Sequence, residues 1–186
     1  MNYSDRYIAI LSGTTESGNS PHTVAETIRR YGLIDENQLP FDDTIKSWND
    51  YYSPKPMEEK YFKLGNDFNL SFEFKHEWVF SQTEQSEKVR LIKEALKRSP
   101  VGMSVYAWGP QNENGVYQKM GVSNHWVCCY GYNDLGWKVF DSYDNTHKLY
   151  SFDADIEMAK LYYILPKPPQ EVKGFWDFIL SFFRRQ

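Results

Sequence analysis

The chain has 186 residues, an apolar fraction of 41%, an aromatic fraction of 17% and a formal net charge of −4. This length allows one substantial domain or two small lobes, and charges of both signs are interspersed, so we expect no nucleic-acid partner. The N-terminus has an early acid and a short apolar run, unlike a signal peptide, and no stretch approaches the roughly 20 apolar residues of a membrane helix. We therefore expect a cytoplasmic protein.

The N-terminal part predicts a helix after a polar loop. The apolar run at 6–11 is too short for periodicity to separate a strand from a helix. Ser20 followed by Pro21 is a typical helix start, because the hydroxyl caps the first amides and proline suits the first turn. The apolar positions that follow share one face, and Gly32 ends the helix. Two connections follow, an extended segment at 33–41 and an ordered, aromatic and proline-containing one at 42–57.

The second half predicts mostly strands. Alternation at 68–80 indicates a half-buried strand, in which His76 is structural. Residues 84–98 predict an amphipathic helix that Pro100 ends. Further strands are expected at 101–108, 149–152 and 161–165.

Residues 124–144 predict a hairpin with a polar pair at its open end. The runs 126–132 and 137–140 are aromatic and β-branched, and the residues between them favour turns. If the chain folds back about Asn133, His125 comes opposite Asp141. A carboxylate beside an imidazole fixes its tautomer and stabilises its cation, as a general base requires. The alternative is a solvated pair at two strand ends.

These elements predict an α+β fold. A partial helical lobe (1–60) precedes an antiparallel sheet or barrel lobe (61–166) that carries His125 and Asp141. A proline-containing hinge and an apolar tail follow at 167–186. The tail is expected either to dock on the domain or to bind a membrane surface or a partner, through Phe175, Trp176, Phe178 and Ile179.

The two cysteines, Cys128 and Cys129, are adjacent. Adjacent strand residues point to opposite faces, so they form neither a disulfide framework nor a paired-thiolate metal site. Cys129 shares the face of His125 but lies about 13 Å away at roughly 3.3 Å per residue. Both are expected to be small apolar residues of the sheet. The sequence predicts no metal site and no cofactor.

The order of these pieces resembles the papain-like cysteine peptidases. A glycine-containing loop precedes a helix and a Gly-Leu-Ile-Asp-Glu run, a Pro-Val strand follows later, and a His-initiated strand ends in Gly-Tyr. The matching segments are 17–20, 20–31, 32–41, the later helix at 91–96, 99–106, 125–132 and 137–141. Asp141-Ser142-Tyr143 stands where the family has Asn-Ser-Trp, so the orienting group and its aromatic shield change in kind. The series covers roughly residues 6 to 165.

The resemblance implies a papain-like fold that is incomplete at its N-terminus. It implies a peptide or polypeptide substrate, with His125 as base and Asp141 as its orienter. Substrate contacts are implied for Gly18, Asn19 and Asn124. The nucleophilic cysteine belongs roughly 130 to 150 residues before the histidine, which falls before Met1 here.

Three interpretations remain open. The chain is the C-terminal portion of a cysteine peptidase, inactive alone, whose thiolate comes from a missing N-terminal segment or a partner. Alternatively, it is a papain-like pseudoenzyme that binds peptides or other proteins. Finally, the resemblance is accidental and the chain is an α+β structural or interaction protein.

Overall fold

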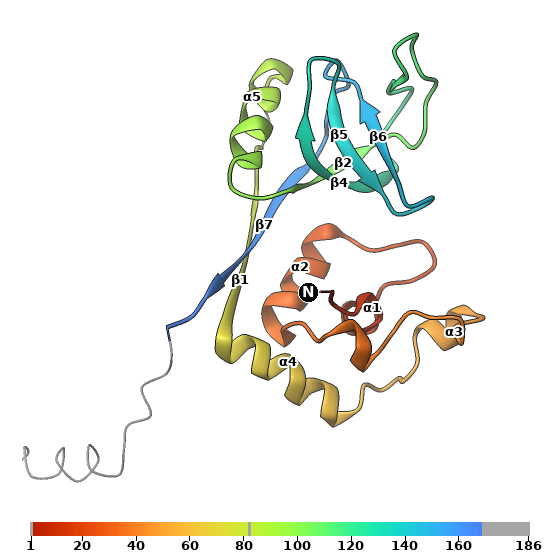
Figure 1. Ribbon diagram of the computed structural model, residues 1–186, viewed down its shortest axis with the longest axis vertical. Helices are drawn as coiled ribbons and strands as arrows, with labels where there is room; N and C mark the ends of the chain where they lie inside the picture. The colour runs from red at the N-terminus through yellow and green to blue at the C-terminus, as the bar shows by residue number, and fades with distance from the viewer. Residues whose placement is uncertain (1, 82, 169–186) are drawn as a thin grey trace, which may run out of the picture. The chain divides into compact units, whose positions relative to one another are not determined.

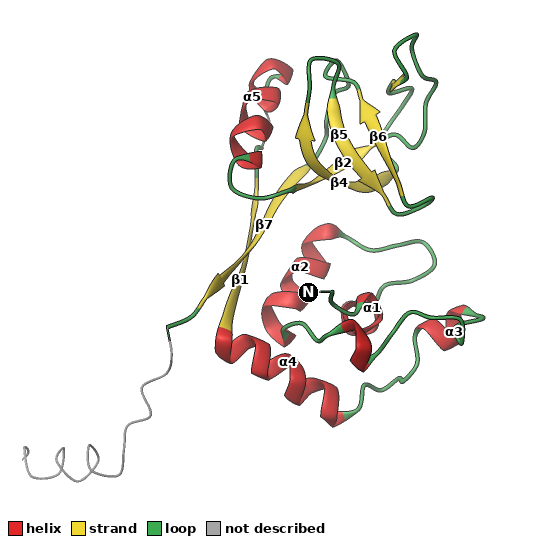
Figure 2. Ribbon diagram, viewed as in Figure 1, coloured by secondary structure: helices red, strands yellow, loops and turns green. Residues whose placement is uncertain are grey.

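The structure, a computed structural model, describes residues 2–81 and 83–168. Helices predominate before residue 72 and strands after it (Figures 1 and 2), which confirms the α+β class. The described chain forms two compact units: unit 1 contains residues 2–73 and 165–168, and unit 2 contains the residues between them. The division into lobes at residues 60 and 166 stays a prediction.

Unit 1 is helical. Ser20 accepts a hydrogen bond from a first-turn amide of the second helix, and Gly32 ends that helix with φ 74°, as predicted. The run at 6–11, which the sequence left open, belongs to the first helix, where the Ser4 hydroxyl caps the amide of Tyr7. The helices are α1 (Asp5–Ser12), α2 (Pro21–Tyr31), α3 (Trp48–Tyr51) and α4 (Glu59–Ser71), and a 3₁₀ turn lies at Glu36–Gln38.

The end of α2 and the middle of α4 approach each other through their backbones. A Cβ on Gly32 would collide with the Gly65 carbonyl oxygen, and a Cβ on Gly65 would collide with the carbonyl of Tyr31 and the hydroxyl of Tyr7. Tyr7 is fully buried, and its hydroxyl donates to the Tyr31 carbonyl at 3.1 Å. Glycine at both positions therefore permits this close packing.

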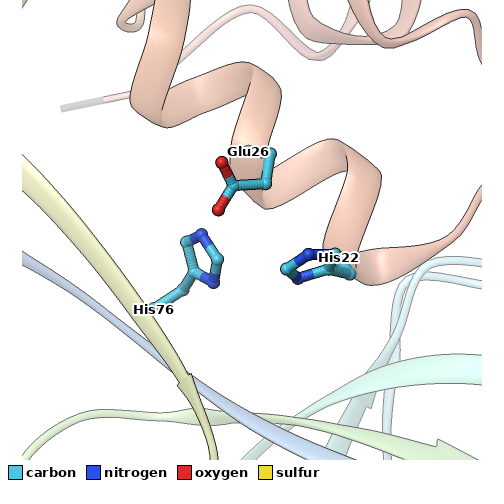
Figure 3. Close-up of side chains that lie close together, drawn as sticks. All are labelled: His22, Glu26 and His76. Carbon is cyan, nitrogen blue, oxygen red and sulfur yellow. The ribbon is translucent and has the colours of Figure 1, made fainter.

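Polar side chains line α2 near its start. His22 and Glu26 lie one turn apart on the helix, as a spacing of four residues requires (Figure 3). Glu26 accepts from the Arg29 guanidinium at 2.6 Å in an exposed pair. Exposed pairs of this kind contribute little to stability, so the buried contacts determine the position of α2.

The buried guanidinium of Arg6 holds the connection between α2 and α4. It donates to the carbonyl oxygens of Pro40 (2.7 Å), Asp50 (2.8 Å), Tyr51 (3.1 Å) and Ser53 (2.6 Å). Several donors in one planar group make such a multiple contact possible. An ordered connection, as expected at 42–57, is confirmed.

Most of a seven-stranded mixed sheet lies in unit 2. The strand order is β1-β7-β2-β4-β5-β6-β3, and the first residues of β1 and the last of β7 belong to unit 1. β2 pairs antiparallel with β4 and β7, and β5 pairs antiparallel with β4 and β6. β3 pairs with β6 in parallel, so the expectation of a purely antiparallel sheet is wrong at this edge. The strands are β1 (Phe72–Trp78), β2 (Val101–Val105), β3 (Val116–Tyr117), β4 (His125–Tyr132), β5 (Trp137–Asp141), β6 (Thr146–Tyr150) and β7 (Ala159–Pro166).

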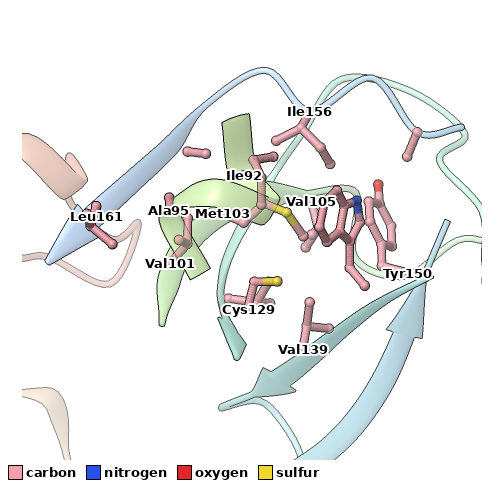
Figure 4. Close-up of a cluster of buried hydrophobic side chains, with 14 residues drawn as sticks. Ile92, Ala95, Val101, Met103, Val105, Cys129, Val139, Tyr150, Ile156 and Leu161 are labelled. Carbon is pink, nitrogen blue, oxygen red and sulfur yellow. The ribbon is translucent and has the colours of Figure 1, made fainter. Parts of the chain in front are cut away.

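The main core lies between the sheet and α5 (Gln85–Leu96), which contacts β2 and β4. Every residue of β2 is buried, and β4 and β5 contribute alternate residues. The cluster combines aliphatic side chains with Trp137 and Tyr150 (Figure 4). Burial of these side chains supplies most of the folding energy of unit 2 and fixes the strands that carry the polar residues described below.

Several predicted strands begin or end elsewhere. β6 covers Thr146–Tyr150 where 149–152 was expected, and β7 covers Ala159–Pro166 where 161–165 was expected. Of the run at 68–80, the residues before 72 belong to α4, because Tyr61, Gly65 and Phe68 form a buried helical face. The run at 101–108 is a strand only to Val105. The chain then turns, and the Asn124 side chain accepts the amide of Ala107 at 2.9 Å.

No helix in residues 2–81 and 83–168 is both long and apolar enough to cross a membrane. The residues for which docking or membrane binding was expected lie outside the described part of the chain. They are Phe175, Trp176, Phe178 and Ile179.

Candidate active site

The hairpin of β4 and β5 brings His125 to Asp141. The His125 Nε2 atom lies 2.8 Å from the Asp141 Oδ1 atom, which confirms the expected juxtaposition. The predicted register, with His125 directly opposite Asp141, is wrong. Cys128 pairs with Phe140, and a bulge follows at Cys129. The turn also spans 133–136, so its centre lies beyond Asn133. The pair therefore meets diagonally across the strands.

Asp141 is completely buried, and both of its oxygens are saturated with donors. Oδ1 accepts from His125 and from the backbone amide of Tyr143 at 3.1 Å. Oδ2 accepts from the indole Nε1 of Trp108 and from the Nζ atom of Lys148, each at 2.8 Å. A carboxylate has about four acceptor sites, so this environment matches an ionised aspartate.

Lys148 is the cationic partner of this carboxylate. Its side chain is 6% exposed, and its ammonium also donates to the carboxylate of Asp144 and to the Thr146 hydroxyl, the latter at 2.7 Å. The ammonium lies 5.1 Å from the centre of the Trp108 ring, a favourable cation–π distance. Its three protons thus have three acceptors, Asp141, Asp144 and Thr146.

These contacts shift the pKa of both charged groups toward ionisation. Burial alone would raise the pKa of Asp141, but hydrogen bonds from Lys148, Tyr143, His125 and Trp108 outweigh burial and hold that pKa well below its usual range. Burial alone would lower the pKa of Lys148, and its bonds to the two aspartates raise it instead. At neutral pH the carboxylate and the ammonium are both charged.

The His125 ring is held by two aromatic side chains and at one nitrogen. Tyr143 stacks on it with ring centroids 3.9 Å apart and an interplanar angle of 30°. Trp108 meets it edge-on at 6.2 Å. Because Asp141 is ionised and can only accept, Nε2 carries the proton of a neutral ring. The other nitrogen, Nδ1, makes no hydrogen bond within the described residues and is available as a base.

Cys129 is the buried, apolar residue of the sheet that the sequence predicted, whereas Cys128 is more exposed than expected. Cys129 is fully buried in the core, and its thiol donates to the Gly131 carbonyl at 3.5 Å. Burial raises the pKa of Cys129 to about 12. Cys128 is exposed, and partial burial of its thiol raises its pKa as well. Neither group is a ready thiolate near neutral pH.

The residues expected to bind substrate lie in loops. Gly18 has a φ of 87°, a conformation that favours glycine. The Asn19 amide donates to the Ser12 carbonyl at 3.0 Å and so closes its own loop. Asn124 precedes β4 and supports the turn after β2 through the Ala107 amide. Their role toward a substrate stays a prediction.

A scan against protein-family models and a search of curated proteins find no match for this chain. Among solved structures, the chain is similar to xylellain, a cysteine protease from Xylella fastidiosa. The likeness covers 89% of this chain and 69% of xylellain, with a TM-score of 0.57 and 17% sequence identity. At this identity it shows the fold alone: the chain has an α+β fold similar to that of a cysteine protease.

Proposed function

We propose that this chain is the C-terminal portion of a papain-like cysteine peptidase and carries the base half of its active site. His125 is the base, Asp141 its orienter, and the attacking thiolate comes from a segment or partner outside these 186 residues. The hydrogen bond between His125 and Asp141, with Tyr143 stacked on the imidazole, is the main support. A fold similar to that of a cysteine protease adds to it.

In the proposed reaction the thiolate adds to the carbonyl carbon of a peptide bond. The His125 imidazolium gives its Nδ1 proton to the leaving nitrogen as the carbon–nitrogen bond breaks, which leaves a thioester. The neutral ring then takes a proton from water, whose oxygen attacks the thioester carbon and releases the acid and the thiolate. Asp141 keeps the Nε2 proton in place throughout, so Nδ1 alone exchanges protons.

The thiolate is assigned to another segment because neither cysteine of this chain suits the role. Cys129 lies in the core with a pKa of about 12. Cys128 and Cys129 are also three and four residues along β4 from His125. At roughly 3.3 Å per residue this is about 10 to 13 Å, whereas proton transfer needs contact within about 3 Å.

A pair of proteins tests the proposal. The first is the chain alone, which should not cleave a fluorogenic peptide amide. The second is the chain extended by the residues encoded immediately upstream of Met1, which should cleave it in a manner lost in His125→Ala and on replacing an upstream cysteine. An upstream sequence without a cysteine would contradict a thiolate supplied by a preceding segment, and the chain would then need a partner that supplies the thiolate to cleave the peptide. Hydrolysis by the chain alone that disappears in Cys128→Ala or Cys129→Ala would contradict an external thiolate.

A peptide-binding pseudoenzyme is the second candidate. It is favoured by a fully assembled His125–Asp141 pair in a chain whose two cysteines are protonated near neutral pH. A peptide library should then yield ligands that bind the chain without being cleaved. Calorimetry should show that binding weakens in both His125→Ala and Tyr143→Ala, while Arg29→Ala, which removes an exposed side chain of α2, leaves the affinity unchanged.

A further inference from the structure

Asp141 creates an electrostatic problem that the hairpin alone does not solve. A buried, uncompensated carboxylate in contact with an imidazole favours the imidazolium strongly, often by one to three pKa units. A histidine held permanently in that form could not accept a proton from water in the second half of the proposed reaction. A neutral orienting group, such as an amide, would not have this effect.

Lys148 lies where it cancels that charge. Its ammonium contacts Oδ2, the carboxylate oxygen remote from His125, at 2.8 Å. Its side chain is 6% exposed and that of Asp141 is fully buried, so little solvent screens the attraction. Asp144, the second carboxylate on Lys148, has a side chain that is 52% exposed. Solvent around Asp144 screens the negative charge of Asp144 and so weakens the effect of that charge on His125 and Asp141.

We propose that Lys148 is a positioning residue of this site, whose ammonium neutralises Asp141 and makes the carboxylate act on His125 as a neutral orienting group. The proposal rests on the proposed function for its catalytic meaning. The effect of Lys148 on His125 can be measured without any peptidase assay. A failure of this proposal is therefore distinguishable from a failure of the proposed function.

The other groups around the pair do not supply this compensation. Asp144 adds negative charge. Trp108 and the amide of Tyr143 are neutral donors. The Tyr150 hydroxyl, on the same strand as Lys148, accepts from the amide of Tyr106 and stays neutral, because burial raises its pKa. Among the described residues that donate hydrogen bonds to Asp141, Lys148 is thus the only permanent cation.

Titration of His125 by NMR in the full chain tests the proposal. The chain has four histidines, and the His125 signals are assigned by their loss in His125→Gln. Lys148→Met should raise the pKa of His125 by about one to two units, the usual effect of a neighbouring charge. Lys148→Gln, which keeps a donor but no charge, should raise it similarly and replaces Lys148→Met if that variant does not fold.

Matched variants separate charge from structure. Lys148→Arg restores the cation and should return the pKa of His125 to within a few tenths of the wild-type value. Lys138→Met removes the same charge from a lysine of β5 that does not contact Asp141, and it should leave the pKa of His125 unchanged. Asp144→Asn removes the exposed carboxylate and should lower the pKa of His125 slightly. An unchanged or lowered pKa of His125 in the neutral Lys148 variants overturns the proposal, whatever the outcome of peptidase assays.

Discussion

Replacing Asp141 with asparagine tests the site most directly, because the change keeps the shape of the side chain and alters only its chemistry. Asp141 faces four donors: His125, the Tyr143 amide, Trp108 and Lys148. An amide offers one acceptor oxygen and a donating nitrogen. In either orientation, the amide nitrogen of the new side chain takes the place of a carboxylate oxygen that accepted two hydrogen bonds. At least one of those two donors therefore loses its acceptor.

The expected loss follows from the buried charge. Hydrogen bonds to charged groups contribute about 1.5–3 kcal/mol each, and removing one partner of a buried ion pair costs about 3–5 kcal/mol. Lys148 keeps its bonds to Asp144 and Thr146, which reduces the penalty. We expect Asp141→Asn to lower the free energy of unfolding at pH 7 by about 2–4 kcal/mol.

Urea unfolding between pH 3 and pH 8 is the assay. The folded pKa of Asp141 lies below the unfolded value of about 3.9. The contribution of the ionised carboxylate is therefore complete above that value and declines as pH falls toward the folded pKa. The difference between wild type and variant should be constant from about pH 6 to pH 8 and shrink below about pH 4. A difference below about 1 kcal/mol at pH 7, or one no larger than that of Asp144→Asn, would refute the reasoning.

Three further outcomes are expected. Gly65→Ala should destabilise the chain by more than about 2 kcal/mol, because its Cβ has no space beside α2; Gly131→Ala, with nothing within 4 Å of the added carbon, is its control in the same urea assay. Arg6→Met should cost about 2–4 kcal/mol by leaving buried carbonyls without donors, and should speed proteolysis at 40–53. With a thiol reagent at pH 8, Cys128 should react in the native protein and Cys129 only after unfolding, since burial raises the pKa of Cys129 to about 12; native modification of Cys129 in Cys128→Ser would contradict its burial.

Elements with local signals were predictable from the sequence. α2 begins and ends where a serine cap, a proline and a glycine indicate, and β4 and β5 follow their aromatic and β-branched runs. α4 was missed because Phe68 and Leu70 suggested alternation, whereas its buried face, with Tyr61 and Gly65, has helical spacing. Short apolar runs fit either period, so tertiary burial decided the outcome.

The candidate site was predictable only where one hairpin builds it. The juxtaposition of His125 and Asp141 follows from the sequence, because one hairpin carries both residues. Tyr143, which stacks on His125, was expected there only from the resemblance to papain-like peptidases. Trp108 reaches Asp141 from a turn 33 residues earlier, after a strand that ends sooner than its composition suggested. No spacing rule connects such a turn to a carboxylate.

The donors Trp108 and Lys148 explain better than the neighbouring residues in the sequence why position 141 holds an aspartate. A site with donors on both sides of a planar group accepts a carboxylate and disfavours an amide. Once Asp141 carries a charge, a buried cation is needed to offset desolvation, and Lys148 on β6 supplies it at 2.8 Å. Aspartate, lysine and tryptophan at these positions therefore form one unit, and single replacements within it should be less than additive when combined. A double-mutant cycle of Asp141→Asn with Lys148→Met measures that coupling, and strict additivity would show that the two charges act independently.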